Sequence, residues 1–545
     1  MKPLVVLYFR FCKFIFFLFF ISIFANCNSN AKNFCDPSTS EFLNLSIVKS
    51  LLNDSSPSCG LNWANTNNGS FTLGGTISGL IATGLVLSSG TTPNQTVSLA
   101  SRVTTFQFAN ALTSNSNYAV TASTQPVGQT CRVSSGSGNI TANVNSVLVT
   151  CTDSIVATPV FSPAPGNYTT SQSNITITTT TPGATIYYTT DGSIPTTAST
   201  QYTTGLGHIW FLAGRTLRAF AVRSGFTDSN IASAEYSYIP LKSGQSLCHN
   251  SAGNLIGCAS TGQDGEVQLG VARGYTNNGD GTVTDNATGL LWQRCSLGLS
   301  DANCSTGSYS PQGWSAGQTQ CTSLTTAGKT WRLPSRYELE TLPDYGIPAP
   351  TIDAVAFPAT DNNRYLSITK QGIATSNVWH VFFNDGALGV FNENSPIQVR
   401  CVSGETQSSF TKFVDNGNGT ILDKQTGLIW QKCSVGQTNI TTTCSGGAST
   451  PNWTSAFGTC TGLGLASRTW RLPNVQELKT IFDVSRASAP TINITFFPGT
   501  VSNNYWSSTT YRPGTTEAWV LDFSNGNINN STKTNVFPVR CVSGP

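Results

Sequence analysis

Two ten-residue segments of the chain carry an arginine and a glutamate at the same spacing, and such a pair could do chemistry. Residues 330–339 read TWRLPSRYEL and residues 469–478 read TWRLPNVQEL. A glutamate held in a cleft could act as a general acid or base. The same letters also fit the start of a helix, because Ser335 and Asn474 each stand three places before the glutamate, which is the spacing of a capping box. We favour this structural role, with Trp and Leu packed beneath the helix.

Other residues that commonly carry catalysis are scarce. The chain has only 3 histidines, His208, His249 and His380, and none lies in a repeated motif. No nucleophile-elbow, phosphate-loop or zinc-helix motif is present. Carboxylates that only folding would bring together are the catalytic alternative that the sequence leaves open. We therefore expect no enzyme activity, no cofactor and no bound metal.

The longest-range pattern in the sequence is a tandem repeat. TGLLWQ at 288–293 returns as TGLIWQ at 426–431, WRLP at 331–334 returns at 470–473, and VRCVSG at 399–404 returns at 539–544. A period of roughly 140 residues is the size of a globular domain and not of a solenoid repeat. The sequence therefore predicts two duplicated domains at the end of the chain.

The composition is that of an exported protein with several domains. Charged residues make up 10% of the 545, whereas soluble proteins have about 25%. The net charge of +3 argues against nucleic acid as a partner, because phosphate binding needs clustered Lys and Arg. Asn, Ser, Thr and Gly must supply the polar surface, which is typical of β-rich extracellular proteins.

The N-terminus has the pattern of an export signal. A positively charged start is followed by the apolar run 14–24, which is short for a bilayer span, so we expect residues 1–26 to be cleaved off. The motif FANC at 24–27 resembles a bacterial lipobox, which implies a lipid on Cys27. An ordinary signal peptide with an incidental cysteine is the alternative. Residues 27–59 would be a tether, and the expected location is the bacterial cell envelope, lipid-anchored to the outer membrane and exposed on the cell surface.

Cysteines are expected to form disulfides. Without Cys12 and Cys27 an even number, 14, remains in an exported chain, which favours disulfides over metal ligands. In each repeat a cysteine on the predicted helix could join one on the last strand and leave the other two to pair locally, although four cysteines allow three connectivities. The cysteines expected to pair are Cys131, Cys151, Cys248, Cys258, Cys295, Cys304, Cys321, Cys401, Cys433, Cys444, Cys460 and Cys541.

Two β-patterned regions precede the repeats. Residues 60–153 contain short alternating runs such as YAVT (118–121) and VLVT (147–150), separated by turn residues, which predicts a β-sandwich. Residues 157–240 predict a second sandwich, in which a strand over 184–190 ends at an Asp-Gly turn. This second region resembles the chitobiase/β-hexosaminidase C-terminal-like domain. The resemblance implies an immunoglobulin-like accessory module without catalytic residues of its own.

Each repeat is predicted to begin with a β-meander. In the second repeat KFVD (412–415), TILD (420–423) and LIWQ (428–431) surround the turn NGNG (416–419), which specifies a hairpin. The first repeat has NGDG (278–281) at this place. A calcium loop is the alternative, but the ligand spacing and bidentate glutamate of an EF-hand are missing. A helix from Trp453 to Cys460 and several closing strands should follow the meander.

The order of these phrases resembles the Lcl C-terminal domain family, named after a bacterial collagen-like adhesin. The matching phrases are the meander ending in TGLIWQKC, then WRLPNVQEL, YWSST, AWVLDFSNG and VRCV. Two copies, at 247–404 and 410–545, cover roughly half of the chain. The resemblance implies a C-type-lectin-like fold and binding to sulfated glycans and surfaces. The first copy departs from it with YLSI at 365–368, so equal activity of the two copies is in doubt. The calcium and sugar motif of true C-type lectins is absent.

Together these features predict a mostly β multidomain protein, with two immunoglobulin-like β-sandwiches followed by two α+β C-type-lectin-like domains. We expect a surface lipoprotein that acts as an adhesin or as a carbohydrate- or matrix-binding protein through tandem lectin-like heads. Its partners would be host glycans or extracellular matrix proteins, and the membrane through its lipid anchor. A structural envelope protein without a soluble ligand is the alternative.

A ligand site, if the second copy has one, is predicted from exposed aromatic and polar side chains. Aromatic rings stack on sugars, and Asn and Arg donate hydrogen bonds. The competing interpretation places both tryptophans of this set in the core. The predicted site residues are Trp506, Ser507, Arg512, Trp519 and Asn525.

Overall fold

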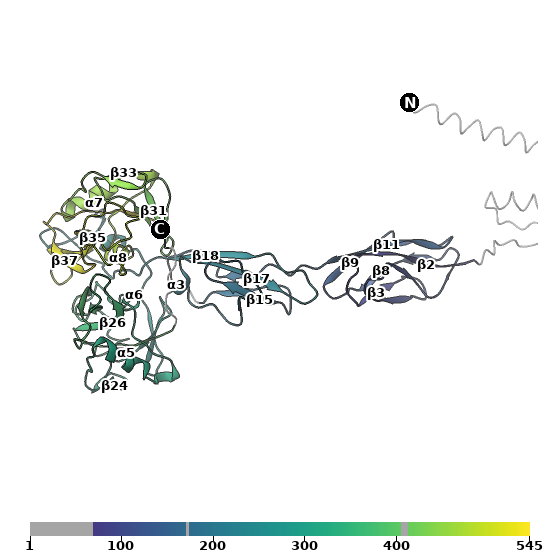
Figure 1. Ribbon diagram of the computed structural model, residues 1–545, viewed down its shortest axis with the longest axis horizontal. Helices are drawn as coiled ribbons and strands as arrows, with labels where there is room; N and C mark the ends of the chain where they lie inside the picture. The colour runs from purple at the N-terminus through teal and green to yellow at the C-terminus, as the bar shows by residue number, and fades with distance from the viewer. Residues whose placement is uncertain (1–68, 171–173, 405–411, 545) are drawn as a thin grey trace, which may run out of the picture. The chain divides into compact units, whose positions relative to one another are not determined.

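A computed structural model describes residues 69–170, 174–404 and 412–544 of the chain. The chain divides into two compact units, residues 1–154 and 155–545, and both are mostly β with few, short helices (Figure 1). Cys27 and the predicted signal and tether lie outside the described residues. Among the residues described, no helix is both long enough and apolar enough to span a membrane.

The first unit is a β-sandwich. Its main sheets have the strand orders β5-β2-β11-β9 and β4-β3-β8, with the small pairs β1-β6 and β10-β7 beside them. Buried and exposed side chains alternate along β11, as a strand with one face on the core requires. Cys131 of β9 lies opposite Cys151 of β11 and forms a disulfide with it. The strands are β1 (Ser70–Phe71), β2 (Leu73–Ser78), β3 (Leu85–Ser88), β4 (Thr96–Leu99), β5 (Thr105–Gln107), β6 (Leu112–Thr113), β7 (Asn117–Ala119), β8 (Thr121–Thr124), β9 (Gln129–Ser134), β10 (Ser137–Asn139) and β11 (Val144–Asp153).

The second unit begins with another sandwich. Its main sheet has the order β13-β18-β17-β15-β16, and β12 pairs with β14. The predicted Asp-Gly turn follows β15, where the Asp191 carboxylate accepts hydrogen bonds from the Ser193 amide and hydroxyl. A one-turn helix, α3, begins at the cap His208. The elements are β12 (Val160–Ser162), β13 (Gly166–Tyr168), β14 (Thr176–Thr178), β15 (Thr185–Thr189), β16 (Thr200–Gln201), α3 (Ile209–Leu212), β17 (Thr216–Val222) and β18 (Ala232–Tyr238).

The two repeats follow, and their elements correspond one to one. The first has β21 (Tyr275–Asn277), β22 (Thr282–Asp285), β23 (Leu291–Gln293), β24 (Leu299–Ser300), β25 (Thr306–Gly307), α5 (Trp314–Thr322), η1 (Thr326–Gly328), α6 (Arg336–Leu339), β26 (Arg364–Lys370), β27 (Asn377–Phe382), β28 (Ala387–Asn392) and β29 (Val402–Ser403). The second has β30 (Phe413–Asp415), β31 (Thr420–Asp423), β32 (Ile429–Gln431), β33 (Thr438–Ile440), β34 (Thr443–Ser445), α7 (Trp453–Thr461), η2 (Leu465–Ser467), α8 (Val475–Lys479), β35 (Asn504–Thr510), β36 (Glu517–Asp522), β37 (Ile528–Thr532) and β38 (Val542–Ser543).

The predicted meander is present in both repeats. The sheet of the second repeat has the order β30-β31-β32-β38, so the last strand of the repeat pairs with the third strand of the meander. The sheet of the first repeat, β21-β22-β23-β29, is the same. The Asp/Asn/Gly cluster forms the hairpin turn between the first two strands, where Asp280 accepts hydrogen bonds from the amide and hydroxyl of Thr282. In the described residues no three His, Cys, Asp or Glu side chains gather in a group that could hold a metal ion.

Each repeat contains two disulfides of the expected kinds. A long-range bridge joins the helix to the residue just before the last strand, Cys321–Cys401 in the first repeat and Cys460–Cys541 in the second. A local bridge closes the loop after the meander. All six disulfides in the described residues are Cys131–Cys151, Cys248–Cys258, Cys295–Cys304, Cys321–Cys401, Cys433–Cys444 and Cys460–Cys541. Six disulfides suggest an extracellular or periplasmic protein.

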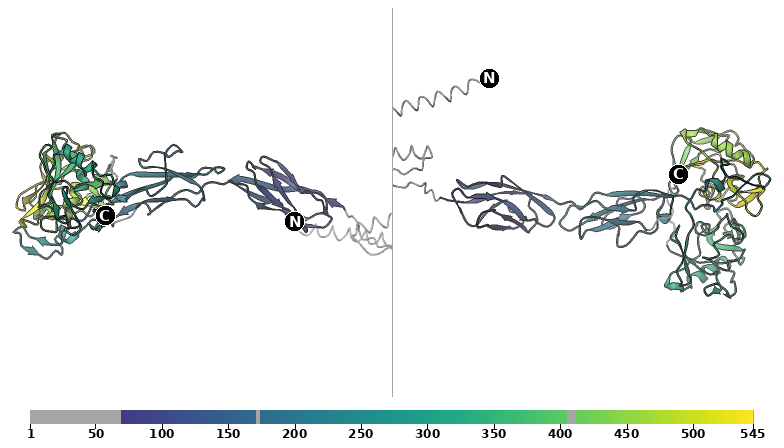
Figure 2. Two further views of the ribbon diagram at one scale, coloured as in Figure 1. Left: turned by 90° about the horizontal axis from the view of Figure 1, so that it is seen from below. Right: turned by 180° about the vertical axis from the view of Figure 1, so that it is seen from behind.

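The two repeats are joined into one body by a shared sheet and a shared core. A six-stranded sheet runs β26-β27-β28-β37-β36-β35, and Leu388 of β28 pairs with Ile528 of β37 across the boundary between the repeats. Trp379 of the first repeat packs on Phe482 of the second at 5.3 Å between ring centroids. Trp519 of the second packs on Tyr345 of the first at 5.1 Å. Figure 2 shows the first repeat, coloured teal to green, lying against the second, coloured green to yellow.

The segment that precedes the first repeat packs against the second repeat. This segment, residues 241–271, contains β19 (Cys248–His249), β20 (Leu255–Ile256) and α4 (Asp264–Val267), and we call it the lead-in. The hydroxyl of Thr509 on β35 donates to the Asp264 carboxylate at 2.6 Å, 245 residues away in sequence. The Lys533 ammonium donates to the carbonyls of His249 and Asn250. The lead-in therefore covers the surface of the second repeat that contains Thr509 of β35 and Lys533.

Candidate ligand-binding site

Two of the predicted site residues lie in the core of the second repeat. Trp506 is 0% exposed, and its indole donates to the Pro451 carbonyl at 3.1 Å. Ser507 is also 0% exposed, and its hydroxyl donates to the Trp519 carbonyl at 2.9 Å. Both belong to β35, a strand with packing on each face. The prediction that they contact a ligand does not fit this burial, since a ring with no accessible surface cannot stack on a sugar.

The other three predicted residues lie where the repeats meet. Trp519 is 1% exposed between the aromatic rings of Tyr345 and Tyr511. The Arg512 guanidinium donates to the Gly346 carbonyl of the first repeat at 2.6 Å. The Asn525 side chain is bonded within its own turn, and its amide donates to Asp522 at 2.9 Å. Trp519 is therefore not an exposed aromatic, and the competing interpretation that both tryptophans belong to the core agrees with the structure.

The repeated Arg and Glu form an ion pair that also caps a helix. Arg471 donates to both carboxylate oxygens of Glu477, at 2.6 and 2.5 Å. The same carboxylate accepts from the backbone N–H of Asn474, whose side chain accepts from the Glu477 N–H. Ser335 and Glu338 form the same capping box in the first repeat. The Glu477 side chain is 1% exposed, so the pair supports the start of α8, as predicted, and does not line a cleft.

A second repeated arginine is also structural. Arg400 and its counterpart Arg540 are 0% exposed. The guanidinium of Arg540 donates to the Gln431 carbonyl at 2.8 Å and to the Thr500 hydroxyl at 2.7 Å, and it lies over the Phe497 ring. Burial lowers the pKa of the Arg540 guanidinium. The Arg540 side chain thereby links the loop after the meander to the end of the repeat. This link explains why Arg540 stands directly before the disulfide cysteine Cys541.

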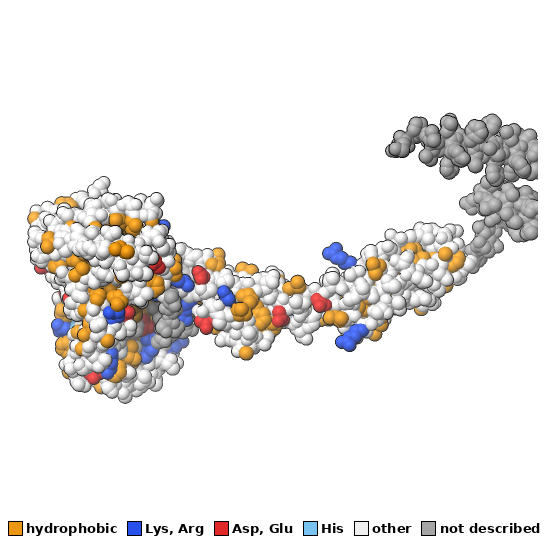
Figure 3. Space-filling view, turned by 45° about the horizontal axis from the view of Figure 1, so that its top comes forward, with side chains coloured by type: hydrophobic (Ala, Val, Ile, Leu, Met, Phe, Trp, Pro, Cys, Tyr) orange, Lys and Arg blue, Asp and Glu red, His pale blue; other side chains and the backbone are white. Residues whose placement is uncertain are grey.

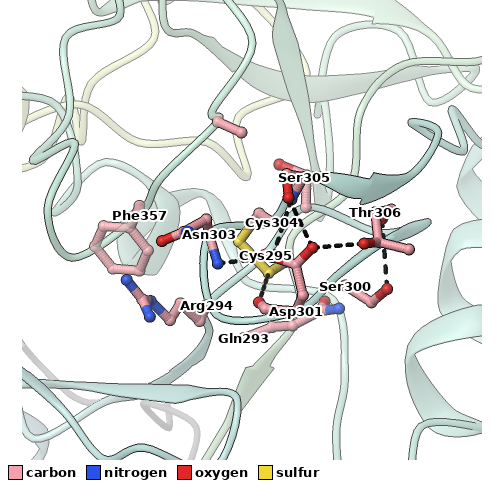
Figure 4. Close-up of a disulfide and its surroundings, with 12 residues drawn as sticks. Gln293, Arg294, Cys295, Ser300, Asp301, Asn303, Cys304, Ser305, Thr306 and Phe357 are labelled. Carbon is pink, nitrogen blue, oxygen red and sulfur yellow. Dashed lines mark hydrogen bonds between the residues drawn. A yellow bond between two sulfur atoms is a disulfide. The ribbon is translucent and has the colours of Figure 1, made fainter.

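The local disulfide closes a loop in which both carboxylate oxygens of an aspartate accept hydrogen bonds from the loop itself. In the first repeat Cys295–Cys304 surrounds Asp301, whose carboxylate accepts from the Asn303 amide, the Ser305 amide and hydroxyl, and the Thr306 hydroxyl (Figure 4). These bonds hold the pKa of Asp301 far below its usual range, with the Thr306 hydroxyl the largest cause. The carboxylate is thus a structural acceptor.

A cavity of about 110 Å³ lies where the second sandwich meets both repeats. The elements α3, α6 and α8, which are labelled in Figure 1, contribute residues to its lining. Its polar wall contains Glu340 and Thr341 of the first repeat and Lys412, Gln476 and Lys479 of the second. Its aromatic wall consists of Trp210, Tyr238 and Tyr337. This is the concave, mixed polar and apolar kind of site that small ligands use.

Comparison with known protein families accounts for the repeats. The model of the Lcl C-terminal domain matches residues 281–403 and 419–543. The chain carries two Lcl C-terminal domains. The model of the chitobiase/β-hexosaminidase C-terminal domain matches residues 163–233, so the second sandwich is a domain of that family. No curated protein matches the chain. The two kinds of domain suggest extracellular binding modules.

The cavity beside the Lcl domains is more basic than acidic. Lys479 is 4% exposed, and its ammonium lies 3.6 Å from the Glu340 carboxylate. Glu340 also pairs with the fully buried Arg336. Burial lowers the pKa of Lys479 to about 8, against the attraction of Glu340. Lys412 lies 3.4 Å from the buried Asp423. The charged residues that line the cavity are therefore two cations, Lys412 and Lys479, and one carboxylate, Glu340, and the excess positive charge suits a ligand with an acidic group.

Gln476 gives the cavity an unused hydrogen-bond donor. The residue is 7% exposed, lines the cavity, and its side-chain nitrogen has no hydrogen-bond partner. A buried donor without a partner costs folding free energy of about 1–3 kcal/mol. Such a group in a cavity wall can recover this cost by donating to a ligand oxygen.

This cavity was not predicted from the sequence. Comparison of the two repeats does show differences at two of its lining positions. Position by position, Gln476 of the second Lcl domain replaces Tyr337 of the first, and Lys479 replaces Glu340. Each pair stands at the same place on the helix that follows the WRLP phrase. The two helices keep their capping box and differ in polarity or charge at these two positions. Only the fold shows that these positions face each other across the cavity.

Proposed function

We propose that this protein is a surface-exposed, lipid-anchored bacterial binding protein without catalytic activity, and that it acts as an adhesin for acidic glycans. The observation that carries the proposal is the unpartnered Gln476 amide in a cavity with excess positive charge. A sulfate or carboxylate group of a glycan would accept from Gln476 and offset the charge of Lys412 and Lys479. The half-exposed Tyr337 (40%) offers a ring edge or face to the sugar that carries this group.

The low density of surface charge supports specific recognition over general electrostatic binding. Figure 3 shows few Lys, Arg, Asp and Glu side chains over the face in view, most of it being uncharged. A protein with a net charge of +3 in 545 residues lacks the broad basic surface that binds any polyanion. Recognition of an acidic glycan would then depend on the few cations of the cavity.

The test compares a sulfated heparin tetrasaccharide with its desulfated counterpart by calorimetry on the mature protein. We expect saturable binding of the sulfated form and a loss of affinity of about tenfold or more in Gln476→Leu, the worth of one hydrogen bond to a charged group. The variant should fold at least as well as the wild type, because the removed side-chain nitrogen has no partner. Gln320→Leu, at an exposed position of α5, is the matched control and should bind normally.

The negative outcomes are equally specific. Equal binding of both tetrasaccharides, or unchanged affinity in Gln476→Leu, would remove the cavity from glycan recognition. Failure of the protein to bind glycans and matrix proteins at all would favour the alternative, a structural envelope protein without a soluble ligand.

The lipid anchor needs its own test, because Cys27 lies outside the described residues. Metabolic labelling with an alkynyl fatty acid in a bacterial host should mark the wild type and not Cys27→Ala. Labelling of both proteins, or of neither, would contradict anchoring through this cysteine.

A further inference from the structure

The two Lcl domains differ in what covers an equivalent face. In the second domain the lead-in packs over β35, and all of Ser508, Thr509 and Thr510 are buried. The equivalent strand of the first domain is β26. There Ile368 is 36% exposed, and the Lys370 side chain is 37% exposed. The same part of the fold is therefore an internal contact in one domain and open surface in the other.

The helix that begins beside each strand shows the same difference. Trp453 of α7 is 1% exposed under Lys533, which in turn donates to carbonyls of the lead-in. Trp314 of α5 has the same place in the first domain and lies under Lys370, with its ring centroid 4.4 Å from the ammonium. Trp314 remains half-buried. The open face of the first domain thus comprises Trp314, Ile368, Thr369, Lys370 and Glu393.

The segment between the two Lcl domains is too short to form a second lead-in. The lead-in spans residues 241–271, whereas residues 405–411 alone separate the first Lcl domain from Lys412 and read ETQSSFT, with no cysteine and no aspartate. The duplication therefore supplied a cover for one domain and not for the other.

The open face keeps one of the groups that bind the lead-in in the second domain, a threonine hydroxyl. Thr509 accepts from the first backbone N–H of α8 and donates its hydroxyl hydrogen to Asp264. Thr369 likewise accepts from the first N–H of α6, at 3.0 Å, and its hydroxyl hydrogen can be donated outward. Three positions have changed. Ser508 is replaced by Ile368, Thr510 by Lys370, and Lys533 by Glu393.

We propose that the open face of the first Lcl domain is a docking site for an acidic loop of a partner polypeptide, built like residues 241–271. An aspartate of this loop would accept from the Thr369 hydroxyl, and Lys370 would add a charge-assisted bond. Where the lead-in presents carbonyls to Lys533, the partner loop would present N–H groups or a basic side chain to Glu393. The Lys370–Glu393 pair, at 2.6 Å on the surface, is worth little by itself and can be exchanged for these contacts.

A peptide copy of the lead-in, residues 243–268 with its Cys248–Cys258 disulfide closed, is the probe. Labelled peptide is titrated with the mature protein and followed by fluorescence anisotropy. Glu393→Lys restores the chemistry of the second domain, so we expect it to bind the peptide about tenfold more tightly than the wild type. Thr369→Val should weaken binding by a similar factor, and so should changing Asp264 of the peptide to Asn.

Two further variants keep the test decisive. Ile368→Arg alters an exposed side chain, so the fold should persist while binding is lost. Thr509→Val changes the equivalent residue of the second domain, whose face the tethered lead-in already fills, and should leave peptide binding unchanged. No binding to Glu393→Lys at about 1 mM peptide, or equal loss in Thr509→Val, would overturn the proposal. Self-association of the wild type that Ile368→Arg abolishes would overturn the assignment to a foreign partner.

Discussion

Removing the charge of Glu477 should cost far more stability than removing a surface carboxylate. Glu477 is 1% exposed and accepts two hydrogen bonds from Arg471 and one from the Asn474 N–H. In Glu477→Gln one carboxylate oxygen becomes an NH₂ group, which must face a donor of Arg471 or Asn474. The substitution therefore breaks a buried ion pair and puts two donors in contact.

The expected cost follows from the geometry. Breaking a fully buried pair by changing one partner costs about 3–5 kcal/mol. The Arg471 side chain is 19% exposed, so water recovers part of its solvation and we expect about 3 kcal/mol. Glu338→Gln in the first Lcl domain should cost about the same, because Arg332 donates to Glu338 at 2.8 and 2.6 Å and Glu338 is 2% exposed.

Urea unfolding of the mature protein, followed by tryptophan fluorescence, measures this cost. Glu235→Gln is the control, because its side chain is 60% exposed at 3.8 Å from Lys424, and it should change stability by less than about 0.5 kcal/mol. A double-mutant cycle with Arg471→Met should give a coupling of about 2 kcal/mol between the pair. A cost below about 1 kcal/mol, or a coupling near zero, would refute the structural role and return the pair to consideration as a functional group.

Three further predictions concern the second Lcl domain and the lead-in that packs on it. Burial raises the pKa of Asp264 to about 6; the folded state therefore holds a proton that the unfolded state has lost, and stability should fall by about 2 kcal/mol between pH 4 and pH 6. Urea unfolding at both pH values should show a fall in stability that is about 2 kcal/mol larger in the wild type than in Asp264→Asn, and an equal fall in both proteins would contradict it. Replacing Cys460 and Cys541 by alanine opens a loop of 81 residues and should cost about 4–5 kcal/mol in the loop-entropy model, measured by chemical unfolding; a cost under 1 kcal/mol would be inconsistent with it. Trp506→Ala should lower stability by about 3–5 kcal/mol without changing glycan affinity, and a selective loss of binding in a stable variant would restore Trp506 to the site.

Much of the architecture could be predicted because it depends on residues close in sequence. The NGNG turn at 416–419 sets the first hairpin of the meander, and the spacing of Asn474 and Glu477 sets the start of α8. The tandem phrases and cysteines revealed the duplication and the kinds of disulfide, and the structure selects one of the three connectivities that four cysteines allow. The predicted domain boundaries at 247–404 and 410–545 remain predictions.

The ligand site could not be predicted in the same way. The phrase YWSST has three polar residues, yet every residue of it is buried. Tyr505 and Trp506 pack into hydrophobic cores, and Thr509 bonds Asp264 of the lead-in, 245 residues earlier in the chain. Trp519 is buried by Tyr345 of the other Lcl domain, which no local pattern specifies.

The sequence by itself thus determined much of the secondary structure, because turn residues and helix caps act on neighbouring residues. It also determined the duplication, through its repeated phrases, and the expectation of an oxidising compartment, through its number of cysteines. The tertiary structure alone decided which tryptophans are buried, that the two Lcl domains share one sheet, and that Gln476 and Lys479 meet Glu340 across a cavity. The physical reason is that burial and charge pairing are properties of contacts between distant segments, and these contacts exist only once the chain has folded.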